Sequence, residues 1–156
     1  MSSAEPRPQD ARSTSIADGP PDLRYYPMYR LLVWQPHGPL TDALLDEIAL
    51  FMTKAEEVSL PFKRYIDLSG ITSILLQESH IVATAKRARQ YHGLAPVRCG
   101  LYCPAKAVFG VGRRFERRMK SSVVDARAFR ERTAAAAWLE VPVEILISSH
   151  QPTCRR

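Results

Sequence analysis

Three cysteines and four histidines are the residues of this chain best suited to redox, metal or nucleophilic chemistry. Cys99 and Cys103 lie four residues apart in an apolar segment, and in a strand this spacing spans about 13 Å. That distance is too long for one disulfide or one shared metal ion, so we expect two small core or edge residues. The histidines lack the spacing of zinc ligands. We therefore predict no metal site and no cofactor. The histidines are His37, His80, His92 and His150.

A hydrolytic triad of Ser79, His80 and Asp67 is the strongest catalytic alternative. Consecutive residues of a helix point about 100° apart, so Ser79 and His80 would not face each other. The strand-to-helix elbow that exposes a nucleophilic serine is not present either. We therefore predict that the protein is not an enzyme.

Asp67 ends an apolar segment and is followed closely by the pair Ser69-Gly70. A carboxylate at the end of a strand can accept hydrogen bonds from the exposed amides of such a turn. Gly70 is also a residue that tolerates a positive φ. We favour this structural role for Asp67 over a functional one.

A basic face is the sharpest surface feature that the sequence predicts. It belongs to an expected helix over residues 105–120, opposite an apolar stripe of Val108, Phe115 and Met119. Such a face suits an acidic protein partner, and a solvated helix face is the alternative. Aromatic residues are not interleaved with the cations, so we expect no nucleic-acid partner. The cations assigned to partner binding are Arg113, Arg114, Arg117 and Lys120.

Length, charge and hydropathy limit the class of protein. The 156 residues, 46% of them hydrophobic, have the size of one domain. The 22 Lys and Arg against 16 Asp and Glu give a net charge of +6, which favours acidic partners. No apolar run approaches the ~18 residues of a membrane-spanning helix, and no signal peptide is recognisable. We expect a cytoplasmic protein without a transmembrane segment.

Strands and helices alternate along the chain, which predicts an α/β fold. Residues 1–24 are rich in proline and polar residues and are expected to form a disordered leader. Residues 25–140 should form the domain and residues 141–156 a C-terminal extension, with 141–147 packed as a strand or an extended arm. We expect strands at 29–34, 62–68, 97–103 and 123–129, and helices at 41–58, 76–91, 105–120 and 130–139.

The order of these elements and four short strings resemble the STAS-like domains of the SpoIIAA-like family, named after the anti-sigma factor antagonist of sporulating bacteria. The resemblance covers residues 29–140. Its strings are His-Gly-Pro-Leu-Thr at 37–41, Asp-Leu-Ser-Gly-Ile at 67–71, the segment 108–116 and Ala-Trp-Leu at 137–139. It implies an α/β, STAS-like single domain with a mixed sheet of about four to five strands covered by about four helices.

The resemblance also directs attention to the turn before the second helix. In phosphorylatable members of the family this turn reads Asp-Ser-Ser-Gly, and a kinase phosphorylates the second serine. On this chain the turn falls on residues 75–78, and the acceptor position is Gln77, which cannot accept phosphate. Ser73 and Ser79 are the nearby alternatives. The resemblance thus implies protein docking, without the serine switch, through Ser73, Gln77, Ser79 and His80.

These observations predict a non-enzymatic, STAS-like regulatory or protein-interaction module. Its partner would be an unidentified protein with an acidic surface that contacts the basic face of the expected helix 105–120. A homodimer of this chain is a further option. The alternative is a binder of a small anionic or lipid-like ligand in a cleft at the strand ends. Open α/β sheets bind ligands beyond the carboxyl ends of their strands, at a topological switch point.

Overall fold

A computed structural model describes residues 14–15, 23–58, 63–89 and 97–148 of the chain. In these residues the main sheet has six strands in the order β1-β2-β3-β5-β7-β8. The strands β3, β5, β7 and β8 are parallel to one another. At one edge of the sheet, β2 pairs antiparallel with β3, and β1 pairs antiparallel with β2. The predicted α/β fold is confirmed. The bounds are β1 Thr14–Ser15, β2 Leu23–Tyr26, β3 Leu31–Trp34, β5 Lys63–Asp67, β7 Val97–Tyr102 and β8 Val124–Phe129.

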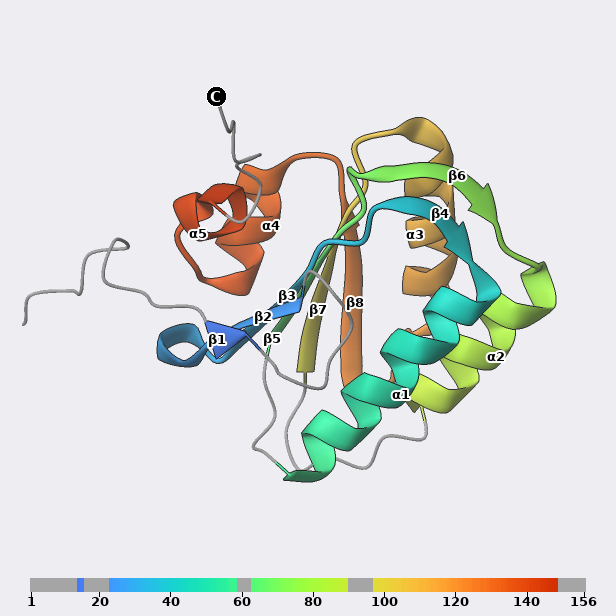
Figure 1. Cartoon of the computed structure of the whole chain (residues 1–156), viewed down its shortest axis with the longest axis horizontal. Helices are drawn as coiled ribbons and strands as arrows, with labels where there is room; N and C mark the ends of the chain where they lie inside the picture. The colour runs from blue at the N-terminus through green and yellow to red at the C-terminus, as the bar shows by residue number, and fades with distance from the viewer. Residues whose placement is uncertain (1–13, 16–22, 59–62, 90–96, 149–156) are drawn as a thin grey trace, which may run out of the picture.

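In the described part of the chain, five α-helices cover the two faces of the sheet, which Figure 1 shows nearly edge-on. The helices α1 (Asp42–Val58), α2 (Glu78–Arg89) and α3 (Lys106–Arg118) lie on one face. The helices α4 (Arg132–Leu139) and α5 (Val143–Ser148) lie on the other, and a 3₁₀ turn, η2 (Pro27–Tyr29), precedes β3. Because α1, α2 and α3 each join neighbouring parallel strands, the strand order never reverses. This sheet therefore lacks the topological switch point on which a cleft at the strand ends was expected.

A second, two-stranded parallel sheet pairs β4 (Gly38–Thr41) with β6 (Ile71–Leu75). Both strands were missed in the sequence, because Pro36 and Pro39 indicated only the end of the preceding strand and residues 71–75 were placed in the connection from the Ser69-Gly70 turn to the next helix. Gly38 adopts a φ of 87° here, the conformation that glycine permits. Gly70 has no positive φ, and its requirement is space, since a Cβ there would collide with the imidazole of His37. These strands carry the chain from the main sheet to α1 and α2 (Figure 1).

Both ends of the described domain differ from the sequence expectations. Segment 141–147, expected as a strand or arm, forms most of α5, and Ile145 and Leu146 are buried in the core beside α4. Glu140 reverses the chain with a φ of 57°, and Pro142 directly precedes the new helix. At the other end, the expected leader of residues 1–24 overlaps β1 and β2, and Leu23 is buried. The rest of that leader, and residues 149–156, lie outside the described residues.

Helix α3 approaches the sheet closely at Gly112. A Cβ at this position would lie 2.9 Å from Cys103 Sγ and 3.1 Å from the Cβ of Ala128. We expect Gly112→Ala to lower the free energy of unfolding by about 1–3 kcal/mol, because the neighbours must shift to admit the methyl group.

Gly110 provides the matched control in the same helix, since beyond the adjacent residues and backbone of its own helix no atom lies within 4 Å of the position of its Cβ. Gly110→Ala should raise the free energy of unfolding by about 0.5–1 kcal/mol, because alanine is favoured in a helix interior. Urea unfolding of the two variants measures both effects. Equal effects of the two substitutions would contradict the close approach at Gly112.

Candidate ligand-binding cavity

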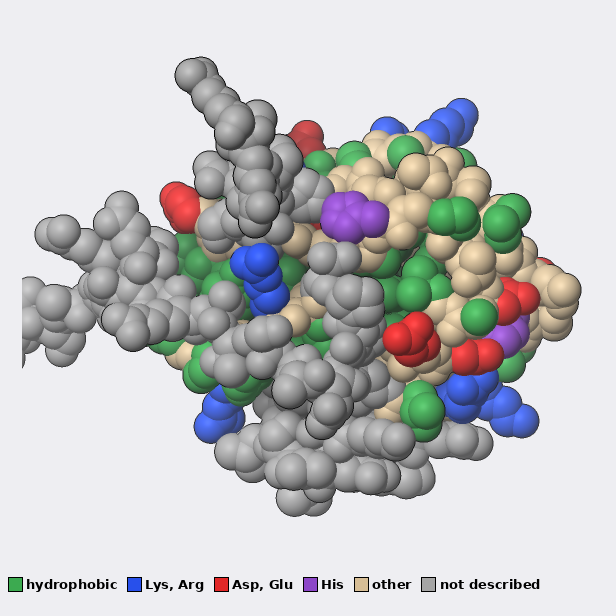
Figure 2. Space-filling view, in the orientation of Figure 1, with side chains coloured by type: hydrophobic (Ala, Val, Ile, Leu, Met, Phe, Trp, Pro, Cys, Tyr) green, Lys and Arg blue, Asp and Glu red, His purple; other side chains and the backbone are tan. Residues whose placement is uncertain are grey.

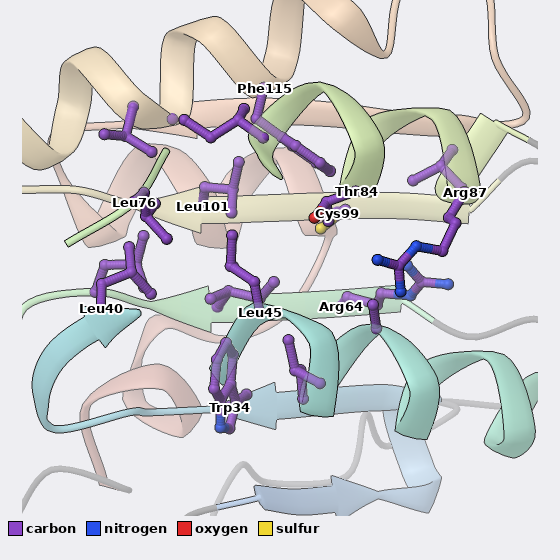
Figure 3. A pocket seen from close by; sticks show the side chains of 18 of the residues that line it. Trp34, Leu40, Leu45, Arg64, Leu76, Thr84, Arg87, Cys99, Leu101 and Phe115 are labelled. Atoms are coloured by element: carbon purple, nitrogen blue, oxygen red, sulfur yellow. The ribbon is translucent and has the colours of Figure 1, made fainter. Parts of the chain in front are cut away.

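A cavity of about 460 Å³ lies between the main sheet and the helices α1, α2 and α3 (Figure 3). Its volume falls within the range of roughly 300–1,000 Å³ that is typical of small-molecule sites. The floor follows from strand register, because Trp34 of β3 aligns with Ile66 of β5, and Ile66 aligns with Leu101 of β7. Alternate residues of a strand point to opposite faces, so these three side chains share one face of the sheet.

The walls come from the apolar stripes of the three helices. Leu45 and Ile48, Ile81 and Thr84, and Gly112 and Phe115 each lie three residues apart, the spacing that places them on one side of a helix. Leu50 of α1 lines the cavity and is 56% exposed, so the cavity reaches solvent beside this helix. The helical lining residues are Leu45, Ile48, Ala49 and Leu50 of α1, Ile81, Thr84 and Arg87 of α2, and Val111, Gly112 and Phe115 of α3.

Two arginines lie at one end of the cavity, Arg64 of β5 and Arg87 of α2 (Figure 3). Arg64 is only 9% exposed and aligns with Cys99 on the neighbouring strand β7. Leu40 and Leu76 lie at the opposite end (Figure 3). The cavity therefore has two arginine side chains at one end and apolar side chains at the other.

The thiol of Cys99 also lines this cavity. Burial raises its pKa, and the charge of Arg64 acts in the opposite direction. Cys103 lies further along the same segment, and burial, aided by Asp67, raises the pKa of its thiol to about 12. Both thiols are protonated at neutral pH and are poor nucleophiles. The prediction of two small core or edge residues is confirmed, since both cysteines are buried and free.

A polar cluster joins α1 to α2 next to the cavity. Asp46 Oδ1 accepts a hydrogen bond from Arg87 Nη2 at 2.8 Å and lies 2.9 Å from His80 Nε2. The backbone N–H of Gln77 donates to Asp42 Oδ1 at 3.2 Å. The pKa of Asp46 is lowered, chiefly by the hydrogen bond from Arg87. Figure 2 shows charged side chains and a histidine gathered over these two helices, which the cluster holds together above the cavity.

The residues predicted for docking at the second helix are thus divided. Gln77 and His80 contact α1 through the polar cluster. Ser73 of β6 and Ser79 of α2 are exposed to solvent. Leu75, at the end of β6, is 61% exposed and extends the same surface.

The cations predicted for the α3 face are exposed, but acidic groups partly neutralise them. Arg113 Nη1 lies 2.8 Å from Glu116 Oε1, and Arg114 Nη1 lies 2.8 Å from Glu78 Oε2 of α2. Arg117 donates from Nε to the carbonyl of Arg113, one turn earlier. Lys120 follows the helix and is exposed. The pair between Arg114 and Glu78 brings the basic face next to the beginning of α2.

Asp67 is fully buried at the carboxyl end of β5, on the face opposite the cavity. Its Oδ1 accepts hydrogen bonds from the amide of Ser69 at 2.9 Å and from the Ser69 hydroxyl at 2.6 Å, which confirms the predicted turn. Its Oδ2 lies 3.3 Å from Arg132 Nη2 of α4 and 3.4 Å from Gln35 Nε2. His80 contacts Asp46 instead, so the three residues of the hypothetical triad are not brought together.

In the ranges that the structure describes, no three His, Cys, Asp or Glu side chains are arranged to hold a metal ion. No helix in these ranges has both the length and the apolar character needed to cross a membrane.

Comparison with known proteins gave no match to a family model, to a curated protein or to a solved structure. The function must therefore follow from the geometry of the cavity and its polar neighbours. Sequence reasoning missed this cavity. One signal was present, because Arg64 lies two residues before Ile66 and so shares with it one face of a strand that helices should cover on both faces.

Proposed function

We propose that this chain is a non-enzymatic, STAS-like regulatory module that binds a small ligand with an apolar body between its sheet and helices α1–α3. The cavity is the observation that carries the proposal. Its floor of Trp34, Ile66 and Leu101 is apolar and joins three central strands. Protein interiors are otherwise close-packed, with few spaces larger than a water molecule, so a space of about 460 Å³ suits a ligand.

Two features support the STAS-like part of the proposal. The main-sheet strands β3, β5, β7 and β8 alternate with α1–α4 in the order that the resemblance implies, and the Asp67-ending strand β5 leads into the Ser69-Gly70 turn. Gln77, at the position of the phosphoacceptor serine, directly precedes α2. Ligand occupancy, rather than phosphorylation, is therefore the proposed signal. A cytoplasmic location belongs to the same proposal, since the two buried thiols are free.

The proposed absence of catalysis rests on the groups that line the cavity. Its thiol, Cys99, has a raised pKa, and its other polar groups are Thr84, the indole N–H of Trp34 and the two arginines. A general base poised near neutral pH is not found among these lining residues. Binding without chemical conversion is the activity that they support.

The experiment is a fluorescence titration of the full chain with N-phenyl-1-naphthylamine, a neutral apolar probe. We expect a blue-shifted emission that saturates at one probe per chain, because the cavity removes the probe from water. The bound probe should also raise the melting temperature, since a ligand stabilises the state that binds it. Emission that rises without saturation would contradict the proposal.

A second candidate function is protein docking at the surface formed by β6 and the beginning of α2. The observation that favours it is Leu75, which is 61% exposed between the exposed Ser73 and Ser79. The ion pair between Arg114 and Glu78 connects this surface to the basic face of α3. A partner that binds there should be released by salt and by charge reversal of Arg113 and Arg117.

A further inference from the structure

We infer that the ligand is a neutral aromatic molecule of about three fused rings, which lies over the row formed by Trp34, Ile66 and Leu101. The inference rests on the proposed function of the cavity and specifies the chemical class of its ligand. The support comes from the volume of the cavity, the shape of its floor, its aromatic side chains and the partners of its polar groups.

The first support is the volume of the cavity. An apolar protein cavity of about 150 Å³ stays dry and binds one molecule of benzene. The cavity between the sheet and helices α1–α3 has a volume of about 460 Å³, roughly three times as large. It therefore has room for about three fused rings.

The second support is the shape of the floor. Along β5 the floor extends from Arg64 to Leu68, and four residues of a strand span about 13 Å. Across the sheet, Trp34, Ile66 and Leu101 belong to three neighbouring strands, and two strand spacings amount to about 10 Å. A single alkyl chain would cover a strip of this floor and leave the remainder empty. A fused-ring system extends in both directions and covers more of it.

The third support is the aromatic lining. Trp34 on β3 and Phe115 on α3 both line the cavity, and Figure 3 shows them on opposite sides of it. Aromatic rings attract one another through offset-stacked and edge-to-face contacts, beyond the effect of the area that they bury. A flat aromatic ligand between these two elements is therefore favoured over an aliphatic ligand of equal size.

The fourth support is that the polar groups of the lining already have partners. Arg87 Nη2 lies 2.8 Å from Asp46 Oδ1, and the Thr84 hydroxyl donates to the carbonyl of His80 at 2.9 Å. Arg64 also takes part in an interaction within the protein, so both guanidinium groups are engaged. A charged head group would lose its water and have to compete with these partners, which disfavours its burial. A neutral ligand avoids this penalty.

Fluorescence titration of the full chain with three neutral arylmethanols tests the size of the ring system. The probes are 1-naphthylmethanol, 9-phenanthrylmethanol and 6-chrysenylmethanol, which have two, three and four fused rings. We expect the affinity to rise about tenfold from two rings to three, because more apolar surface is buried. It should then fall roughly threefold with the fourth ring, because an overfilled cavity forces its walls apart.

A second set of probes tests the charge and the rigidity of the ligand. Phenanthrene-9-carboxylate and 9-phenanthrylmethylammonium should each bind about tenfold more weakly than 9-phenanthrylmethanol, because burial of either charge is disfavoured. Undecan-1-ol, a flexible alcohol that is no less apolar, should also bind about tenfold more weakly, since its chain must be ordered on binding. Displacement of N-phenyl-1-naphthylamine measures the affinity of this non-fluorescent alcohol.

Leu45→Ala should change the preferred number of rings, because Leu45 lines the cavity from α1 and its truncation enlarges the space. In this variant we expect 6-chrysenylmethanol to bind roughly threefold more tightly than 9-phenanthrylmethanol. Leu44→Ala is the matched control, since Leu44 is also partly buried on α1 but does not line the cavity. Its affinity maximum should stay at three rings. Circular dichroism verifies that both variants are folded.

The outcomes separate the inference from the proposed function. An affinity that continues to rise with the fourth ring in the unmodified chain would overturn the ring number, and equal affinities for the neutral and charged phenanthrenes would overturn the neutral ligand. An affinity maximum that stays at three rings in Leu45→Ala would overturn the position of the rings. Saturable binding of N-phenyl-1-naphthylamine without binding of any arylmethanol would overturn the inference alone. If neither that probe nor any arylmethanol binds, both the inference and the proposed function fail.

Discussion

Replacement of Asp67 by alanine is expected to lower the free energy of unfolding by about 3–5 kcal/mol, the loss typical when one partner of a buried ion pair is removed. Asp67 is fully buried, and its two oxygens serve different parts of the fold. Oδ1 holds the Ser69 turn, and Oδ2 faces Arg132 of α4 and Gln35. The variant would leave these donors unsatisfied and the Arg132 guanidinium without its buried carboxylate. Urea unfolding, followed by circular dichroism, measures the change.

Asp125→Ala is the matched control, because Asp125 is half exposed on β8 and lies 4.0 Å from Arg127. Its effect should stay within about 0.5 kcal/mol, as for most surface substitutions. Asp67→Asn should be milder than Asp67→Ala, since Asn retains an oxygen that can accept from the Ser69 amide. A loss below about 1 kcal/mol in Asp67→Ala would contradict the role assigned to this cluster.

Replacement of Ala49 by phenylalanine is expected to abolish saturable binding of N-phenyl-1-naphthylamine. Ala49 lines the cavity from α1, and a benzyl group there would fill much of the space that the probe needs. The same substitution should raise the free energy of unfolding by about 0.5–2 kcal/mol, the usual gain from filling a cavity. Loss of binding together with a gain of stability separates occlusion of the site from damage to the fold.

The control lies on the same helix. Ala43 is exposed and does not line the cavity, so Ala43→Phe should leave probe binding unchanged. Thermal unfolding and the probe titration check both variants. Unaltered probe affinity in Ala49→Phe would place the probe elsewhere on the protein.

Much of the fold could be predicted from the sequence because local patterns determine it. Leu44 and Ile48 recur at helical spacing, and α1 spans Asp42–Val58 against the expected 41–58. The segment at 141–147 was wrongly expected as a strand or arm, because a short apolar run does not distinguish a strand from a buried helix. The deciding feature is the left-handed conformation of Glu140, a residue type for which a positive φ is uncommon.

The candidate site was harder to predict because it depends on contacts between distant segments. Trp34, Ile66 and Leu101 share a floor only through the register of three parallel strands. His80 suggested catalysis or docking beside Ser79, yet its partner is Asp46, 34 residues earlier on α1. Arg64, a charge on the same strand face as Ile66, indicated from the sequence that this face differs from an ordinary core.

Tryptophan quenching by a brominated naphthalene tests the central claim most directly. The chain has two tryptophans, of which Trp34 lines the cavity and Trp138 lies on α4, on the opposite side of the sheet. In a Trp138→Phe variant, we predict that 1-bromonaphthalene quenches Trp34 and that the quenching saturates at one molecule per chain. In a Trp34→Phe variant, the emission of Trp138 should stay unquenched over the same concentrations. Equal quenching of the two tryptophans, or none at Trp34, would contradict a ligand-binding cavity between the sheet and helices α1–α3.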